Sequence, residues 1–256
     1  MDKLAFITGA SSGIGQALAW RYHQAGWRLA LAARRKDAIE AWMQDKNIPA
    51  DRCTAYAVDV SDVDGTVAAG RDCIDKHGVP DTVIANAGVS IGMDTAYRED
   101  IDVMARLFAT NNTGLAATFH PFIEGMTKRG SGRLVGMASV AGIRGLPGHG
   151  AYCASKAGVI AYCESLRGEL RASGVKVVTI LPGYIDTPLT QGNSYSMPFL
   201  MPAEDFARIA FDAIEAGASW KVIPWQMSII TKLMRAMPNF LYDITFANRP
   251  RKQRQQ

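Results

Sequence analysis

Tyr152 and Lys156 are the two residues of this sequence whose types and spacing most directly suggest chemistry. They occur in the segment YCASK, and four positions on a helix place two side chains on one face, about one turn apart. A phenol has a pKa of about 10, so it exchanges protons poorly at neutral pH, but a nearby ammonium favours the phenolate. The spacing therefore predicts a proton-transfer pair, although two structural residues of an ordinary helix would show the same pattern.

Ser139 is the third candidate. It ends the strand-like run RLVGMAS, thirteen residues before Tyr152, and the Gly-rich stretch AGIRGLPGHG follows it. The carboxyl ends of parallel strands open toward the ligand crevice, so this hydroxyl could donate to a substrate carbonyl and stabilise developing charge. A nucleophilic role is disfavoured, because Ser139 does not stand in a G-x-S-x-G turn and the histidines offer it no convincing base partner. We interpret His149 as a loop or pocket-rim residue.

A Gly-rich turn, TGASSGIG, follows the first strand-like run and leads into a helical pattern. Gly9, Gly13 and Gly15 would let the backbone approach a pyrophosphate, and the helix N-terminus would present free N–H groups to it. The alternative is an ordinary tight turn between strand and helix. The position directly after a strand favours a dinucleotide site.

The second strand-like run ends in AARR, where a dinucleotide fold places the adenosine ribose. Ala33 offers no carboxylate to repel a 2′-phosphate, and the Arg34 guanidinium could clamp that phosphate, so the sequence predicts NADP(H) rather than NAD(H). Arg35 either assists or is a solvated surface charge. Asp59, after the third strand, either meets the adenine amino group or caps the next helix.

Short β-rich runs alternate with longer segments of helical period along the chain. Seven strands are expected: KLAFIT, RLALAA, TAYAV, TVIANA, RLVGMAS, VKVVTIL and WKVIP. Helices are expected at about 13–26, 37–46, 62–77, 99–128, 151–173 and 202–217. Because the strands are apolar on both faces, we predict an α/β fold: a Rossmann-like, doubly wound parallel sheet of seven strands with helices on both faces, plus a C-terminal helical segment.

Composition narrows the function classes. The chain has 256 residues and 28 basic against 24 acidic side chains. Four of the basic residues, Arg249, Arg251, Lys252 and Arg254, lie in the last eight positions, so the body is neutral, unlike a nucleic-acid-binding protein. Four scattered cysteines without a CxxC pair favour a reducing cytoplasm and no metal site. A strand beginning at Lys3 leaves no room for a secretory signal.

One domain accounts for the whole chain: residues 1–225 form the nucleotide-binding catalytic unit and 226–256 a helical extension with a basic tail. In the extension, apolar residues recur at helical spacing, with Lys232 and Arg235 off that stripe. The stripe consists of Met227, Ile230, Met234, Met237 and Leu241. We expect this face to pack on its own domain or on a partner subunit. An interfacial helix touching anionic membrane together with the basic tail is the alternative.

The chain resembles the short-chain dehydrogenase/reductase family over residues 3 to about 225. The motifs TGASSGIG, ANAG, TNNTG, Ser139, YCASK and LPGYIDT stand in that family's order and approximate spacing. The resemblance implies four catalytic residues: Asn111, Ser139, Tyr152 and Lys156. Tyr152 would protonate the carbonyl oxygen, Lys156 would lower its pKa and hold the nicotinamide ribose, and Ser139 would orient the carbonyl. Asn111, rather than Asn112, would kink the central helix and hold a water in the proton relay.

The resemblance also implies how the cofactor is held. Asn86 would brace the sheet, Ala87 and Gly88 would lie against the cofactor, and the LPGYIDT segment would wrap the nicotinamide, with the Ile185 backbone meeting its carboxamide. The cofactor-binding residues expected are Gly9, Ser11, Ser12, Gly13, Ile14, Gly15, Arg34, Arg35, Asp59, Val60, Asn86, Ala87, Gly88, Tyr152, Lys156, Pro182, Gly183, Ile185 and Thr187.

Three departures from the family pattern stand out. Ala85 replaces the first Asn of NNAG, and Ala138 replaces one of a pair of serines, but neither has a chemical role. The usual Asp-Gly-Gly close after the last strand is absent, which puts the family's common tetramer in doubt. A homodimer through the helices at 99–128 and 151–173 is expected, with a tetramer left open.

The predicted function is an oxidoreductase that uses NADPH to reduce a hydrophobic aldehyde or ketone, or the reverse reaction. The segment 188–202 carries Tyr195, Phe199 and several methionines, and it would close an apolar substrate pocket, unless it is packed core. A catalytically idle NADP(H)-binding sensor or scaffold protein is the alternative. The set Ser139, Tyr152, Lys156 and Asn111 favours the enzyme.

Overall fold

A parallel sheet of seven strands forms the centre of the protein in the computed structural model, which describes residues 2–191, 193, 195–247, 252 and 254. The strands are β1 (Leu4–Thr8), β2 (Arg28–Ala33), β3 (Cys53–Ala57), β4 (Thr82–Ala85), β5 (Gly132–Met137), β6 (Val175–Pro182) and β9 (Trp220–Ile223). Their order is β3-β2-β1-β4-β5-β6-β9, and every neighbouring pair is parallel. The predicted Rossmann-like sheet is confirmed.

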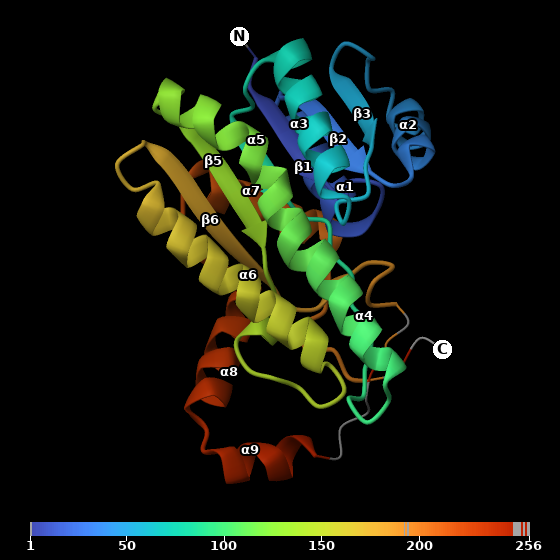
Figure 1. The fold of residues 1–256 in the computed structure, drawn as a ribbon, viewed down its shortest axis with the longest axis vertical. Helices are drawn as coiled ribbons and strands as arrows, with labels where there is room; N and C mark the ends of the chain where they lie inside the picture. The colour runs from blue at the N-terminus through green and yellow to red at the C-terminus, as the bar shows by residue number, and fades with distance from the viewer. Residues whose placement is uncertain (1, 192, 194, 248–251, 253, 255–256) are drawn as a thin grey trace.

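Helices cover both faces of the sheet (Figure 1). One face carries α1 (Gly13–Gln24), α2 (Lys36–Asp45) and α7 (Ala203–Glu215); the other carries α3 (Val63–His77), α4 (Glu99–Phe108), α5 (Gly114–Arg129) and α6 (Gly150–Glu169). Each face of the sheet has its own hydrophobic core, and successive residues of a strand point alternately into the two cores. In β1, Ala5 and Ile7 pack toward α1 and α7, whereas Leu4 and Phe6 pack toward α3 and α5. Burial on both faces explains why the strands read as continuous apolar runs.

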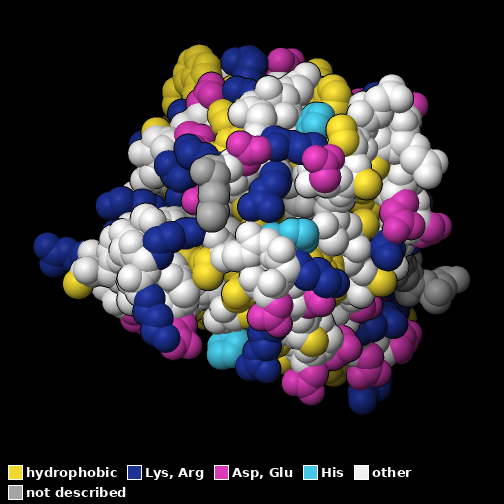
Figure 2. All heavy atoms as spheres, turned by 90° about the horizontal axis from the view of Figure 1, so that it is seen from above, with side chains coloured by type: hydrophobic (Ala, Val, Ile, Leu, Met, Phe, Trp, Pro, Cys, Tyr) yellow, Lys and Arg dark blue, Asp and Glu magenta, His cyan; other side chains and the backbone are white. Residues whose placement is uncertain are grey.

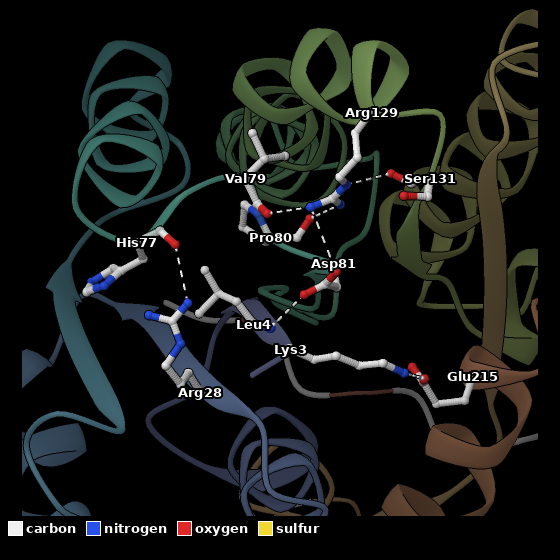
Figure 3. Close-up of polar contacts among 10 residues, drawn as sticks. All are labelled: Lys3, Leu4, Arg28, His77, Val79, Pro80, Asp81, Arg129, Ser131 and Glu215. Atoms are coloured by element: carbon white, nitrogen blue, oxygen red, sulfur yellow. Dashed lines mark hydrogen bonds and ion pairs between the residues drawn. The ribbon is translucent and has the colours of Figure 1, made fainter. Parts of the chain in front are cut away.

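The amino ends of the strands are held by a network of polar contacts (Figure 3). Asp81 accepts a hydrogen bond of 2.8 Å from the Leu4 N–H, which joins the start of β1 to the segment before β4. Arg129, at the end of α5, donates to the carbonyls of Val79 and Pro80 at 2.8 and 2.7 Å. These contacts fix the end of the sheet opposite the ligand crevice, so they contribute to stability rather than to the site.

We expect Arg129→Ala to destabilise the fold by about 2 kcal/mol, because the Val79 carbonyl and the partly buried Pro80 carbonyl lose a charged donor. The free energy of unfolding is measured by urea titration. Lys128→Ala is the matched control, since its ion pair with Glu124 lies at the surface and is worth less than about 0.5 kcal/mol. Equal midpoints for the two variants would contradict the assigned role of Arg129.

The long helix expected at 99–128 is not continuous. A π-helical segment, Ala109–Thr113, separates α4 from α5, and Asn111 lies at its centre. Pro121 is accommodated within α5, which ends at Gly130 with a positive φ of 72°. The interruption lies beside the crevice, where π-helical turns frequently mark functional sites.

The C-terminal extension forms two helices rather than one. Helix α8 (Trp225–Ala236) follows β9 directly, and Pro238 starts a separate helix, α9 (Asn239–Phe246). The predicted single apolar stripe is therefore wrong at its end: Met227 is buried, but Leu241 is 45% exposed because the chain turns at Pro238. A two-stranded ladder of β7 (Ile185–Asp186) and β8 (Met201–Pro202) was also not predicted.

Two residues of the basic tail return to the body of the domain. Arg254 pairs with Asp100 through Nε at 2.6 Å and Nη2 at 3.1 Å, and its guanidinium lies 3.5 Å from the Tyr97 ring centroid. These hydrogen bonds hold the pKa of Asp100 below its usual range. Lys252 donates to the Ser90 hydroxyl at 3.1 Å. The predicted tail residues Arg249 and Arg251 lie outside the described residues.

Candidate active site

A cleft of about 450 Å³ opens at the carboxyl ends of the central strands. Its walls come from the segments that follow β1, β2, β3, β4, β5 and β6, and from the start of α6. Apart from Gly15 and Asn111, every residue predicted to bind the cofactor or take part in catalysis lines this cleft. The topology thus gathers residues that are far apart in the sequence at the edge where open α/β sheets bind ligands.

In the turn after β1, backbone atoms lie so close together that two positions have room only for glycine. Gly9 has a φ of +67°, and a Cβ atom there would lie 2.8 Å from the Cα of Ala87. A Cβ on Gly15 would lie 2.3 Å from the Gly9 carbonyl oxygen, so Gly15 is a packing residue behind the turn rather than part of the cleft wall. This cradle and the N-terminus of α1 fit a pyrophosphate group.

The far end of the cleft carries the predicted adenosine residues. Arg34 and Arg35 are exposed there, with Arg35 directly preceding α2. Asp59 accepts from the Ser61 hydroxyl at 2.7 Å, and this hydrogen bond, with a smaller effect of Arg34, holds the pKa of Asp59 below its usual range. The N-cap of α3 is Asp62, not Asp59. Asp59 is therefore a turn residue, and it lines the cleft.

Asn86 ties the cleft floor to the sheet. Its amide Nδ2 donates to the carbonyls of Thr8 and Gly9 at 3.0 and 3.3 Å, and its backbone N–H donates to the Thr8 hydroxyl at 3.1 Å. The ends of β1 and β4 are thus cross-linked by one side chain. This geometry agrees with the bracing role predicted for Asn86, and it keeps the Gly9 turn in place.

Ser139 lies in a buried position at the inner end of the cleft. Strand β5 ends at Met137, two residues earlier than predicted, and Ser139 instead precedes a short 3-10 helix, Val140–Gly142. Its Oγ accepts a hydrogen bond of 3.1 Å from the Ala141 N–H. Because an acceptor bond fixes the oxygen and leaves the hydroxyl proton available, Ser139 can donate toward the cleft.

Tyr152 and Lys156 lie on the first turns of α6, as their spacing predicts. Burial raises the pKa of the Tyr152 phenol, and a hydrogen bond with the Ser139 hydroxyl partly offsets this rise. The phenol and the Ser139 hydroxyl therefore lie together. Lys156 Nζ lies 5.9 Å from the centroid of the phenol ring.

The pKa of the Lys156 ammonium is also shifted. It is buried, donates to the Met137 carbonyl at 2.8 Å, and burial lowers its pKa to about 8. Gly88 lies directly beside it, since a Cβ on Gly88 would be 3.3 Å from Lys156 Nζ and 3.2 Å from Asn111 Oδ1. Strongly perturbed groups in a cleft are typical of functional sites.

Asn111 lies behind the cleft wall rather than on it. Its amide Nδ2 donates to the Val89 carbonyl and the Ser155 hydroxyl at 3.0 and 2.9 Å, and its Oδ1 accepts from the Val89 N–H at 2.9 Å. The π-helical segment is thus joined to the chain after β4 and to α6. Asn112 instead donates to the Ser155 carbonyl at 2.9 Å.

A cluster of His149, Tyr184 and Tyr195 rings lies beside the start of α6. His149, predicted to lie at the rim, is buried and precedes α6; burial lowers its pKa. The Tyr195 hydroxyl lies 3.4 Å from His149 Nε2, and the Tyr184 and Tyr195 rings are 6.3 Å apart. Tyr195 thus faces inward, while Phe199 and Leu200 of the same segment are about half exposed.

Sequence reasoning missed several residues of the cleft wall. These are Val58, Val89, Thr110, Met137 and Ala138, whereas Ala33 and the lining residues Pro188, Leu189 and Thr190 fall at positions that it had singled out. Most are direct neighbours of predicted residues, so extending each motif by one position would have found them. Among the described residues, no group of three His, Cys, Asp or Glu side chains is placed to hold a metal ion. Nor does any described helix have the length and apolar character to cross a bilayer.

Comparisons with known proteins agree with the geometry. A family model described as short chain dehydrogenase matches residues 3–197. An uncharacterized oxidoreductase from Myxococcus xanthus is 37% identical over 241 residues, which is 94% of this chain and 95% of the relative.

Solved structures share the fold. A short-chain dehydrogenase/reductase from Burkholderia phymatum, in complex with NAD, superimposes with a TM-score of 0.82 at 23% identity, covering 100% of this chain and 98% of that one. The 3-ketoacyl-(acyl-carrier-protein) reductase from Brucella melitensis, complexed with NADH, gives 0.77 at 24% identity over 86% and 96%. The chain therefore belongs to the short-chain dehydrogenase/reductase family of oxidoreductases.

Proposed function

We propose that this oxidoreductase uses NADPH to reduce a hydrophobic aldehyde or ketone to an alcohol. One observation carries the proposal: the Ser139 hydroxyl, the Tyr152 phenol and the Lys156 ammonium all line the same cleft, which begins at the Gly9 turn. A carbonyl placed between a hydroxyl donor and a phenol can be polarised and protonated in one position.

The cofactor would lie along the cleft. The turn from Gly9 to Ile14 and the N-terminus of α1 would hold the pyrophosphate, and the exposed Arg34 would pair with the 2′-phosphate of NADP(H). Asp59 lines the same end and would meet the adenine. When bound, the nicotinamide would supply the hydride.

The chain's own residues supply the proton. Because burial raises the pKa of Tyr152, the phenol is protonated at neutral pH and can act as the acid of a reduction. Ser139 would donate a hydrogen bond to the carbonyl oxygen, and the Lys156 charge would stabilise the phenolate that forms. Asn111 would act as a positioning residue through Val89 and Ser155, with a water relaying the proton to Lys156.

The segment 188–202 supports an apolar substrate. Its residues Pro188 and Leu189 line the cleft, and its Tyr195 ring lies 6.3 Å from the ring of Tyr184. Apolar side chains in this part of the wall favour a hydrophobic carbonyl compound over a sugar or an acid.

The proposal also includes a homodimer and a location in a reducing compartment. The exposed apolar residues Ile101 and Met104 on α4 and Tyr162 on α6 support a homodimer through these helices. The four cysteines are free and buried, which supports a reducing compartment such as the cytoplasm.

The test is NADPH oxidation, followed by nicotinamide absorbance, with a panel of aldehydes and ketones of increasing apolar size. Turnover of the apolar members supports the proposal. Tight NADPH binding with no turnover of any carbonyl compound would favour the idle sensor instead. Oxidation of the corresponding alcohols with NADP⁺ gives the reverse direction.

We expect Arg34→Asp to reverse the cofactor preference. The new carboxylate repels the 2′-phosphate and can accept from a ribose 2′-hydroxyl, so the ratio of kcat/KM for NADPH over NADH falls roughly tenfold to a hundredfold. Steady-state kinetics with both cofactors measure this ratio. Lys36→Asp is the matched control, because Lys36 is exposed two positions further on and does not line the cleft. An equal fall in that variant would show that Arg34 has no specific role in cofactor choice.

A further inference from the structure

The outer surface of helices α8 and α9 is apolar. Six large side chains are exposed there, from 45% of the surface of Leu241 to 75% of Ile244. They are Trp225, Ile229, Leu233, Phe240, Leu241 and Ile244. Fifteen large hydrophobic residues are exposed among the described parts of the chain, so these two short helices hold a large share of them. We call these six residues the α8–α9 apolar surface.

Helical geometry shows that this surface faces away from the domain. Trp225, Ile229 and Leu233 recur every four residues and form one stripe along α8, while Met227 and Thr231 of the same helix are buried. On α9, Tyr242 and Phe246 are buried and stack with ring centroids 4.4 Å apart. Each helix therefore already has an inner apolar face, and the exposed residues form a second one.

The two helices are fixed to the domain by one arginine. Arg144 lies 3.8 Å from the Tyr242 ring centroid, and it donates to the Met237 carbonyl at 2.6 Å, to Asn239 Oδ1 at 3.0 Å and to the Met234 carbonyl. The Tyr242 hydroxyl also donates to the Gly145 carbonyl at 2.6 Å. The apolar surface is thus presented by anchored helices, and it adjoins the loop that follows Ser139.

The charges around this surface are mostly positive. Lys232 borders the α8 stripe and Arg235 is exposed one turn further on. Helices α8 and α9 carry these two basic side chains and a single acid, Asp243. At the opposite end of the molecule, by contrast, basic and acidic side chains are interspersed and apolar atoms are scattered between them (Figure 2). Figure 1 shows α8 and α9 projecting from the end of the molecule toward which the arrow of β5 points.

We propose that the α8–α9 apolar surface docks on an anionic phospholipid bilayer. Exposed Leu, Ile, Trp and Phe side chains beside Lys and Arg are the composition of an interfacial helix, in which apolar side chains enter the acyl boundary and cations meet lipid phosphates. No described helix is built to cross the membrane, so the contact is peripheral. This inference is independent of the cofactor preference and of the substrate.

A second copy of the chain fits this surface less well. A twofold interface brings the same patch of both copies together, so Lys232 and Arg235 would approach their own equivalents with only Asp243 to compensate. An anionic lipid surface offers the opposite charge over the whole patch.

Flotation with lipid vesicles tests the proposal. The full-length protein is mixed with vesicles of phosphatidylcholine alone or of phosphatidylcholine with phosphatidylglycerol. We expect the protein to float with the anionic vesicles. The variant Ile229→Gln/Leu233→Gln/Ile244→Gln is expected to reduce the membrane-bound to free ratio roughly tenfold or more, because three apolar side chains no longer enter the bilayer. All three positions are more than half exposed, so the core is unchanged.

The matched control is Ala236→Gln/Thr245→Gln/Ala247→Gln, which places three glutamines at exposed positions of the same helix pair. It is expected to float like the wild type, and Lys232→Glu/Arg235→Glu to lose the preference for anionic vesicles. Circular dichroism verifies the fold of each variant. A wild type that stays unbound, or a control variant that loses binding equally, overturns the proposal. Light scattering that shows the first variant alone changing its oligomeric state, without lipid, would assign the surface to a second copy and overturn it as well.

Discussion

Tyr152→Phe is expected to lower kcat for carbonyl reduction by about 10³-fold, with the NADPH dissociation constant changed no more than a few-fold. The substitution removes one oxygen, the only group of Tyr152 that can carry the transferred proton, and general acid catalysis contributes about 10²–10⁴-fold. The ring stays in place on α6, so the cleft keeps its shape. Single-turnover rates and fluorescence titration with NADPH measure the two quantities.

Tyr162→Phe provides the control, because it makes the same change on the same helix at a surface position. It should leave kcat unchanged. If Tyr152→Phe retained the wild-type rate at saturating substrate, the proton would come from elsewhere, and the role proposed for this phenol would have to be abandoned.

Lys156→Met is expected to lower kcat/KM by roughly 10²–10³-fold and to remove an alkaline limb from the pH profile. Burial lowers the pKa of Lys156 to about 8. Reduction needs the ammonium charge to stabilise the Tyr152 phenolate, so the wild-type rate is full below pH 8 and falls as pH rises through that value. Methionine carries no charge at any pH, and its apolar chain matches the buried stem of the lysine.

The measurement is kcat/KM for NADPH-dependent reduction on both sides of pH 8, with saturating cofactor. Lys128→Met, on the exposed surface of α5, should retain the wild-type profile. An alkaline limb that persists in Lys156→Met would show that another group titrates there.

The sequence predicts the sheet well because its signals are local. Each strand is a short apolar run between helical patterns, and a run buried on both faces can only lie inside a parallel sheet covered by helices. The Gly9 turn is also predicted from local sequence, because glycine readily adopts the positive φ that this turn requires. Strand ends are less well predicted, and β5 stops short of Ser139.

What the sequence did not predict depends on contacts between distant residues. The π-helical segment is stabilised where Asn111 bonds to Val89 and Ser155, 22 and 44 residues away in the chain. A helical pattern alone carries no trace of those bonds, and only the family resemblance implied an interruption at Asn111. In the sequence, Arg144 likewise has the pattern of a loop residue. Its partner Asn239, at the start of α9, lies 95 residues further along the chain. The sequence also suggests an effect of the Lys156 charge on the pKa of Tyr152. Burial has the largest effect on the pKa of both residues, however, and burial is known only once the fold is known.

The ion pair between Arg254 and Asp100 has a consequence for biosynthesis. Asp100 is buried, and its partner is 154 residues further along the chain. During translation Arg254 is therefore made after every strand of the seven-stranded sheet. The segment around Asp100 can reach its final contacts only once residues 101–254 have been synthesised, so it completes its structure later than the strands that precede it.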